Sequence, residues 1–503
     1  MLEELRSRGR WSPRRPWRQW QAERDRLLHR FVNEQLYPFS PYYRRLFDAQ
    51  RIDPHAVRRV ADLRSLPLTT KTDIAPTIDD PLRHLDLVLQ PDADSIRRFG
   101  AKSMVLELLL ARLMHGEANA KERVRLEYAP VHATFTTGRT ALPTQFLYAS
   151  ADFERLHVVG KRLVDVQGAL PGERGLNVFP FAPHLAFWQV FAVGQAATML
   201  FMHTGGGKVM GTPGNITALE RMQPEMLMGV PGYVYHLLRK AAERGVRLDK
   251  LKRIALGAER VPPALKVRLG ELCEQMGRPS VSVQGVYGFT EARMAWAECP
   301  APDHETSYGY HTYPDLEVFE TVDPDTGESV GEGQRGELVY TTLGGRGSCV
   351  LRYRTGDIVE GGIVCEPCPG CGRVVPRICG ALSRRSDIGE FQLTKIRGTL
   401  VDLNEFLPVM AAIEEVVEWQ LVVKKHNDDP QDLDELLLYI ALREGVEERP
   451  VASRISRDLL QRVEVAPNRI EVMPLAQLET SLGLDTQLKE TRIRDIRNLV
   501  AGA

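Results

Sequence analysis

Short apolar segments alternate with helical patterns through the middle of the chain, and this alternation constrains the fold more than any other feature. The apolar segments lie at residues 176–181, 198–202, 226–230, 253–257, 281–288 and 336–343. Strands that alternate with helices predict an α/β fold built from strand–helix–strand units. The pattern restarts after residue 387, with strands expected at 416–425, 435–443 and 469–474 and a helix at 451–463.

This restart predicts two domains. We expect a large, multi-layer N-terminal domain with mixed sheets over residues 1–384, and a small α+β C-terminal domain over residues 385–503. A charged, turn-rich stretch followed by an apolar helical pattern at 103–115 interrupts the large domain. An insertion at about 78–126 is therefore expected.

Composition excludes several classes of protein. The 503 residues include 65 Lys and Arg against 66 Asp and Glu, and 43% are hydrophobic, which is typical of a soluble globular protein rather than a disordered or fibrous one. A balanced charge gives no reason to expect nucleic acid or an anionic membrane as partner. The charged N-terminus does not resemble a signal peptide, so a cytoplasmic location is expected.

The N-terminal arm has an unusual charge. The first 60 residues contain 14 Arg and no Lys against 7 acidic residues. A solvated helical arm and an arm that binds anions or docks a partner both fit this pattern. Residues 19–36 carry apolar side chains at helical spacing, which predicts one amphipathic helix; the side chains are Trp20, Leu27, Leu28, Phe31, Val32 and Leu36.

A loop rich in hydroxyl groups, TFTTGRTALPT at 134–144, is the first candidate for chemistry. Backbone N–H groups and Thr hydroxyls can bind phosphate oxygens, and Arg139 adds positive charge. The loop lacks the G-x-x-x-x-G-K-[ST] spacing of a Walker A motif. By itself the loop indicates little more than a turn.

Two further segments place polar groups beside strands. In GVYGFTEARM, Tyr287, Gly288, Thr290 and Glu291 follow an apolar strand. In LRYRTGDIV we expect Asp357 just after a strand, where its carboxylate can accept two hydrogen bonds from a ribose.

Taken in order along the chain, these segments resemble the adenylate-forming superfamily, and most closely its phenylacetate-CoA ligase branch. The resemblance covers most of the chain: an opening segment at 40–74, the loop at 134–144, GAE at 257–259, YGFTE at 287–291, GELVYTTL at 336–343, LRYRTGDIV at 351–359 and LKETRIRDIR at 488–497. It implies an enzyme that uses ATP and Mg²⁺ to convert a carboxylic acid to an acyl-adenylate and then to a coenzyme A thioester. An adenylating ligase with an amine or a carrier-protein thiol as acceptor, and a non-catalytic relative, remain as alternatives. A homodimer is compatible with each of these interpretations.

The resemblance assigns roles residue by residue. It implies that Thr136, Thr137, Gly138 and Arg139 hold the ATP phosphates, that Tyr287 lies against the adenine with Glu259 beside it, and that Asp357 and Arg385 hold the ribose. Gly288 is counted among the nucleotide-binding residues. Thr290 and Glu291 would contact the phosphates and Mg²⁺, and Lys489 would be the catalytic lysine. Asp387 would be the hinge of a C-terminal domain that acts as a mobile lid.

The chain departs from the family pattern in the phosphate loop. Phe135 stands where the family has a glycine, Pro143 lies further along than usual, and Ile388 replaces a second hinge acid. If the backbone at Phe135 needed a positive φ, the phenylalanine would be strained there.

Four of the seven cysteines lie close together at 365–379. Cys368 and Cys371 form a C-x₂-C pair, a spacing suited to two ligands of one tetrahedral metal ion. The resemblance implies a structural Zn²⁺ held by these two with Cys299 and His311; His304 and Cys365 are the substitutes, and free buried thiols the alternative.

An aromatic segment, FPFAPHLAFWQVF at 179–191, resembles the wall of the acyl pocket in the superfamily. Phe181, His184, Phe187 and Trp188 would face an aromatic or short apolar acid. For Phe187 and Trp188 an ordinary core helix is an equally good interpretation.

Overall fold

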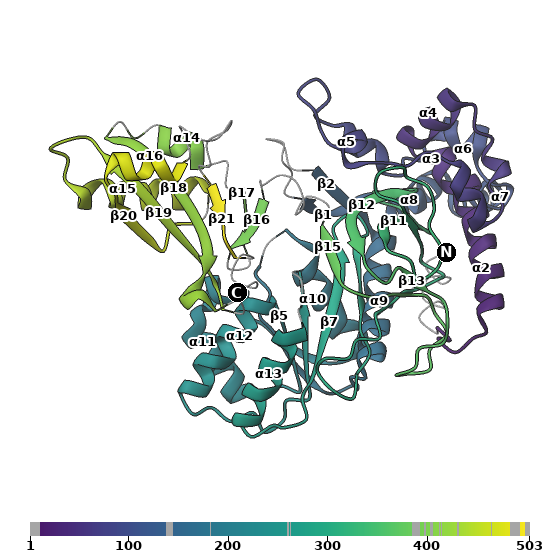
Figure 1. Cartoon of the computed structure of the whole chain (residues 1–503). Coiled ribbons are helices and arrows are strands. Elements are labelled where there is room, and N and C mark those ends of the chain that lie inside the picture. The colour runs from purple at the N-terminus through teal and green to yellow at the C-terminus, as the bar shows by residue number, and fades with distance from the viewer. Residues whose placement is uncertain are drawn as a thin grey trace.

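The structure is a computed structural model, and it describes residues 11–136, 144–181, 183–258, 261, 263–384, 393–396, 399–402, 406–411, 413, 415–429, 432–463, 465–482 and 493–497. These residues form a mixed α/β fold with several separate sheets, as the sequence predicts. Figure 1 shows the larger body with the C-terminal sheet and its helices beside it. The boundary predicted between residues 384 and 385 stays a prediction, because residues 385–392 are not among those described.

The central sheet has six strands in the order β4-β3-β5-β6-β7-β8, parallel except for β8. Its strands are β3 (Arg174–Asn177), β4 (Leu200–His203), β5 (Met226–Gly229), β6 (Arg253–Gly257), β7 (Ser282–Phe289) and β8 (Met294–Ala297). The helices between them are α10 (Leu185–Ala197), α11 (Gly207–Met222), α12 (Pro231–Glu243) and α13 (Pro263–Gln275). The predicted alternation is therefore confirmed. Strand β3 ends before the expected residue 181, because the Asn177 side chain accepts a hydrogen bond from the Phe179 N–H and turns the chain.

A second sheet is antiparallel, in the order β10-β11-β12-β15, and a small three-stranded sheet has the order β13-β14-β9. Their bounds are β9 (Tyr310–His311), β10 (Glu317–Val322), β11 (Gly336–Thr342), β12 (Tyr353–Val359), β13 (Ile363–Val364), β14 (Arg377–Ile378) and β15 (Leu382–Arg384). Ahead of the central sheet, hairpin β1 (Pro130–Thr136) and β2 (Thr144–Ala149) leads into helix α9 (Ser150–Gln167).

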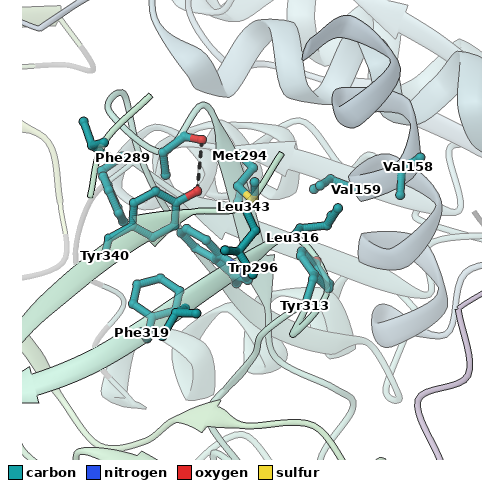
Figure 2. Close-up of a cluster of buried hydrophobic side chains, with 14 of the residues drawn as sticks. Val158, Val159, Phe289, Met294, Trp296, Tyr313, Leu316, Phe319, Tyr340 and Leu343 are labelled. Carbon is teal, nitrogen blue, oxygen red and sulfur yellow. Dashed lines mark hydrogen bonds between the residues drawn. The ribbon is translucent and has the colours of Figure 1, made fainter. Parts of the chain in front are cut away.

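An aromatic core joins the central sheet to the antiparallel sheet. Phe289 of β7 and Trp296 of β8 meet Phe319 of β10 and Tyr340 of β11, with ring centroids 4.8 Å apart for Trp296–Phe319 and 5.2 Å for Phe289–Tyr340. Figure 2 shows this cluster, with Val158 and Val159 of α9 on its other side. Burial of such large rings stabilises the contact between the two sheets.

The N-terminal region is helical. Its elements are α2 (Trp17–Phe31), the π-helical turn η1 (Val32–Leu36), α3 (Tyr37–Phe39), α4 (Pro41–Gln50), η2 (Pro54–Ala56), η3 (Val60–Ser65), α5 (Lys71–Ile74), η4 (Arg83–Leu87), α6 (Ala93–Phe99), α7 (Lys102–His115) and α8 (Glu117–Tyr128). The helices predicted at 19–36 and 103–115 are confirmed, and all six apolar residues named for the first are buried. None of the described helices combines the length and the apolar character that crossing a membrane requires.

The C-terminal part has its own sheet, in the order β20-β19-β18-β21. Its elements are β16 (Leu393–Ile396), β17 (Thr399–Asp402), α14 (Phe406–Ala411), β18 (Val416–Lys425), η7 (His426–Asp428), β19 (Asp434–Leu442), α15 (Glu448–Val463), β20 (Arg469–Val472), α16 (Leu475–Leu482) and β21 (Ile493–Asp495). Helix α15 connects the parallel pair β19 and β20 and contributes to a hydrophobic core made only of residues after 405. The predicted strands and helix are confirmed.

Candidate active site

Two hydrogen bonds connect the end of β7 to strand β12 in the neighbouring sheet. The hydroxyl of Tyr287 donates to Asp357 Oδ2 over 2.7 Å. The hydroxyl of Tyr353 donates to Glu291 Oε1 over 2.8 Å. The two segments that the sequence keeps far apart, YGFTE and LRYRTGD, therefore lie side by side.

The ring of Tyr287 is half-buried among aromatic side chains. Its centroid lies 5.7 Å from those of Phe289 and Trp296 and 5.8 Å from that of Tyr310. Next to it, Gly288 allows β7 and β8 to approach closely, because a Cβ there would lie 3.0 Å from the Ala295 Cβ. The tyrosine is thus held at the sheet end by the aromatic core.

Asp357 lies inside strand β12 and not after it, so the sequence prediction was wrong on this point. The reason is a bulge: Glu337 pairs with Ile358, but Val339, two residues further along β11, pairs with Arg354. Gly356 within the bulge has a φ of +77°, which glycine adopts without strain. The bulge re-aims the carboxylate of Asp357, a buried residue, toward Tyr287.

The turn after β7 carries Thr290 and Glu291, and Arg293 holds it in place. The Arg293 N–H donates to the Thr290 carbonyl over 3.1 Å. The Arg293 side chain is buried and forms an ion pair of 2.9 Å with buried Asp152 at the start of α9. A buried pair of this kind fixes the turn relative to the helix.

Several predicted site residues lie outside the described part of the chain. These are Thr137, Gly138, Arg139, Glu259, Arg385, Asp387 and Lys489, together with Pro143 and Ile388. For Thr136 only the backbone is described, at the end of β1.

Phe135 is described, and it is not strained. It lies in β1 opposite Gln145 and is absent from the residues with positive φ. Its N–H donates to the Pro183 carbonyl over 2.9 Å, and its carbonyl accepts from His184 Nδ1 over 3.2 Å. The strand that leads into the hydroxyl-rich loop is thereby attached to the segment before α10.

Aromatic side chains gather where these two segments meet. The ring centroids of Phe181 and Phe187 are 5.1 Å apart, and those of Phe187 and Trp188 are 5.5 Å apart. Phe187 is buried at 9% exposure, whereas Phe181 is 61% exposed. The sequence did not indicate that His132 and His203 join this cluster, 4.7 Å from Trp188 and 5.6 Å from Phe187.

Four potential metal ligands converge beside the small sheet. The ligand atoms of Cys299, His311, Cys368 and Cys371 all lie within 4.8 Å of one another. The Cys299 and Cys368 sulfurs are 3.8 Å apart, and His311 Nε2 lies 3.2 Å from the Cys371 sulfur. Of the substitutes, His304 contacts Gly270 of α13, and Cys365 lines a separate cavity. These are the four residues predicted as one set.

The cluster is suited to a metal ion by its chemistry. Hydrogen bonds from Cys299 lower the pKa values of the Cys368 and Cys371 thiols, which favours the thiolate form that binds metal. A tetrahedral ion bound at ~2.3 Å from sulfur has sulfur–sulfur edges of ~3.8 Å. The separation of the two thiols matches that edge.

Two residues that sequence reasoning missed complete the strand contacts. Tyr353 holds Glu291, and buried Thr69 pairs with β12 through its N–H to the Arg352 carbonyl, 2.9 Å, and its carbonyl to the Arg354 N–H, 2.8 Å. Both residues lie inside segments quoted for the resemblance. Their position in those segments was the available signal in the sequence.

The C-terminal sheet contacts the large body through acidic residues after β18. Asp429 Oδ1 accepts from the Arg268 guanidinium over 2.6 Å, and Asp429 Oδ2 from the Tyr235 hydroxyl over 3.5 Å. Asp432 pairs with Arg239 at 3.3 Å. Helices α12 and α13 thus form one side of this contact.

Known proteins resemble the chain in sequence and in fold. Residues 163–345 match the family model described as AMP-binding enzyme. A phenylacetate-coenzyme A ligase from Thermus thermophilus is 28% identical over 435 residues, covering 86% of this chain and 83% of that protein. The Escherichia coli phenylacetate-coenzyme A ligase is 23% identical over 479 residues, covering 92% of each.

Solved structures share the fold. A 2-hydroxyisobutyryl-CoA ligase in its thioesterification state superposes with a TM-score of 0.70 at 20% identity, covering 96% of this chain and 92% of that one. The same ligase in its postadenylation state gives a TM-score of 0.56. The family match, the sequence relatives and the shared fold agree with the resemblance carried by the motifs. Residues 163–345 thus match the AMP-binding enzyme family, and the sequence relatives are phenylacetate-coenzyme A ligases, the branch that the motifs resemble.

Proposed function

We propose that the chain is an AMP-forming acid–thiol ligase, which activates a carboxylic acid with ATP and transfers the acyl group to coenzyme A. The observation that carries the proposal is the pair of hydrogen bonds between β12 and the end of β7. They bring a half-buried aromatic ring, a carboxylate for a ribose and a carboxylate for a metal–phosphate group to one place. The relatives named phenylacetate-coenzyme A ligase support the same activity.

The described residues would divide the nucleotide between them. Tyr287 would lie against the adenine, and Asp357 would accept hydrogen bonds from the ribose hydroxyls. Thr290 and Glu291 would contact the phosphates and hold Mg²⁺, which when bound neutralises phosphate charge. Thr136, Thr137, Gly138 and Arg139 would bind the phosphates at the end of β1; Glu259 and Arg385 would complete the adenine and ribose contacts.

Two half-reactions follow from this arrangement. In the first, a carboxylate oxygen of the acid forms a bond to the α-phosphorus of ATP, and pyrophosphate leaves. Lys489 would stabilise the charge that develops on the α-phosphoryl oxygens. In the second, the coenzyme A sulfur bonds to the acyl carbon while the acyl–oxygen bond breaks, and AMP leaves.

Residues 385–503 would be the mobile lid, with Asp387 as its hinge. The contacts of Asp429 and Asp432 with α12 and α13 would hold the lid in one arrangement. The higher TM-score to the thioesterification state supports assigning this arrangement to the second half-reaction.

The aromatic cluster supports an aromatic or short apolar acid as substrate. Exposed Phe181 leans on buried Phe187, so an apolar surface is held in place next to the strand that leads into the phosphate loop. Such a surface binds an apolar acyl group by excluding water from it. His184, attached to the Phe135 carbonyl, would set the distance between the two sites.

The cluster of Cys299, His311, Cys368 and Cys371 would hold a structural Zn²⁺ with four protein ligands. The ion would fix the small sheet, because Cys368 and Cys371 come from the chain that returns to pair with His311 through β14. Thiol ligands persist in a reducing compartment, which fits the cytoplasmic location expected from the sequence.

Release of pyrophosphate across a panel of carboxylic acids, with and without coenzyme A, tests the proposed activity. We expect release with aromatic or short apolar acids, and a thioester product only with coenzyme A. The variant Asp357→Ala should lose ATP-dependent release, whereas Glu328→Ala, at an exposed position outside the site, should retain it.

Two outcomes would overturn the proposal in different ways. Acid-dependent release with no thioester, and a product with an amine or carrier-protein thiol instead, would identify the other acceptor class. Saturable ATP binding without release for any acid would identify a non-catalytic relative.

A further inference from the structure

Helix α7 exposes a row of large apolar side chains that the proposed activity does not use. The exposed fractions are 58% for Leu106, 49% for Leu109, 46% for Leu110, 82% for Leu113 and 66% for Met114. Helix α7 itself lies at the right-hand edge of the molecule in Figure 1, within the predicted insertion. Among the described residues no segment covers this face. Exposed apolar patches of this kind mark interaction surfaces.

The exposure along α7 follows a heptad pattern. Ser103, Leu106, Leu110 and Leu113 have the 3-4-3 spacing of the a and d positions of a coiled coil, and all four are exposed. Lys102 and Leu109 then occupy g positions, and Glu107 and Met114 occupy e positions; these four are also exposed. The residues on the opposite face, Met104, Val105, Leu108 and Ala111, are half-buried or buried. The helix therefore packs on its own domain through one face and presents a complete seam on the other.

The charges of the seam favour a second copy of the same helix in parallel orientation. In a parallel pair each g residue faces the e residue five positions further along the other helix. Lys102 of one copy would face Glu107 of the second, and Leu109 would face Met114. Two opposite-charge pairs and two apolar pairs would result, by the two-fold symmetry of an isologous interface.

An antiparallel pair does not match the seam. In that orientation e faces e and g faces g, so Glu107 would face apolar Met114 or another Glu107, and Lys102 would face Leu109 or another Lys102. Neither Lys102 nor Glu107 has an ion pair with another described residue, so both are available to a partner. Arg112, which pairs with Glu117 at 3.3 Å, lies off the seam.

We propose that α7 is a homodimer interface, in which two copies of the chain pair in parallel through Ser103, Leu106, Leu110 and Leu113. Burial of eight such seam residues from each copy would remove the exposed leucines from water, which is the main source of free energy for the association. The ion pairs between Lys102 and Glu107 would set the orientation.

Sedimentation equilibrium of the full chain measures the association. We expect a dimer for the native sequence and a monomer for Leu113→Glu. The ligase activity of Leu113→Glu should be unchanged, because Leu113 is outside the proposed active site, whereas its melting temperature should fall to that of the dissociated chain. The charge reversals Lys102→Glu and Glu107→Lys should each raise the dimer dissociation constant about tenfold. The double variant should return it toward the native value, since the opposite charges again face one another.

A cysteine in the seam tests the orientation. In a parallel pair, and not in an antiparallel one, the a position Ser103 of one copy lies beside Ser103 of the other. Mild oxidation of Ser103→Cys should therefore give a covalent dimer. The native chain, which has seven cysteines, should not form a covalent dimer under the same conditions. A native chain that stays monomeric would overturn the proposal. Binding of the monomeric chain to phosphatidylcholine–phosphatidylglycerol vesicles, measured by co-sedimentation, would likewise overturn it and would identify α7 as a membrane-binding face. A dimer whose dissociation constant is unchanged by Leu113→Glu would also overturn it.

Discussion

The hydroxyl of Tyr287 donates a hydrogen bond of 2.7 Å to the carboxylate of Asp357, and the two residues belong to different sheets. This bond joins the end of β7 to the bulge of β12. It fixes the direction of a carboxylate that would bind the ribose, and it does so from the residue that would bind the adenine.

Replacing Tyr287 with Phe keeps the ring and removes this bond. We expect the KM for ATP to rise about tenfold, which corresponds to about 1.4 kcal/mol, while the melting temperature changes little. Tyr310→Phe is the matched control, because its ring also packs against Tyr287 but its hydroxyl is not bonded to Asp357. The same KM for both variants would mean that the Tyr287 hydroxyl does not position the nucleotide site.

Tyr353 holds Glu291, and its loss should be seen in the metal dependence. In Tyr353→Phe the glutamate loses a buried donor, so we expect the Mg²⁺ concentration for half-maximal pyrophosphate release to rise several-fold. Excess Mg²⁺ should restore most of the rate. Tyr340→Phe, whose hydroxyl contacts the Ala292 carbonyl at 3.5 Å rather than Glu291, should behave as the native chain does. A rate loss that Mg²⁺ does not restore would argue against a metal role for Glu291.

Atomic emission on the purified chain tests the metal cluster. We expect about one zinc ion per chain, and less than about half after Cys371→Ser, together with a lower melting temperature because a closed four-ligand site contributes to folding. Cys365→Ser is the control, since Cys365 is outside the cluster. Less than half a zinc ion in the native chain would leave the four residues as free thiols and a histidine.

The sequence predicts the central sheet and the Cys368–Cys371 pair well, because both depend on local signals. Apolar segments that alternate with helices are visible directly, and the C-x₂-C spacing of Cys368 and Cys371 marks a metal knuckle. Cys299 and His311 required the family resemblance, because only the fold brings β9 next to β14.

Other features depend on contacts between distant segments. The local sequence pattern places Asp357 after a strand, because the bulge arises from pairing with β11 and a local pattern does not report strand pairing. The same holds for Phe135, whose extended backbone comes from its pairing with Gln145. The role of Tyr353 depends on how two sheets pack, which no local pattern reports.

The ion pair between Arg268 and Asp429 connects the C-terminal sheet to α13. If it holds the arrangement for thioester formation, Asp429→Arg should slow that step several-fold while acid-dependent pyrophosphate exchange keeps its rate. The double variant Arg268→Asp with Asp429→Arg should recover the thioester rate, measured in a single-turnover assay from supplied acyl-adenylate. Arg247→Ala, at an exposed pair within the large body, is the control. An equal loss in both half-reactions would count against a conformational role.

Glu317 is a fully enclosed acid at the start of β10. One carboxylate oxygen accepts hydrogen bonds from the Tyr313 N–H and from Trp296 Nε1, the latter over 3.2 Å. The other oxygen has no partner among the described residues, and the side chain lines a cavity of about 60 Å³. Burial raises the pKa of Glu317 from its ordinary 4.5 to about 8.

A raised pKa means that the folded chain binds this proton more tightly than the unfolded chain does. The contribution of Glu317 to stability is therefore complete below pH 4.5 and is lost as the pH rises to 8. We expect the free energy of unfolding to fall by up to about 1.4 kcal/mol per pH unit in this window from this residue alone. Glu317→Gln keeps the accepting oxygen and should remove that part of the slope in urea unfolding followed by tryptophan fluorescence. The exposed control Glu328→Gln should retain the native slope; a native slope in Glu317→Gln would show that the buried acid does not titrate there.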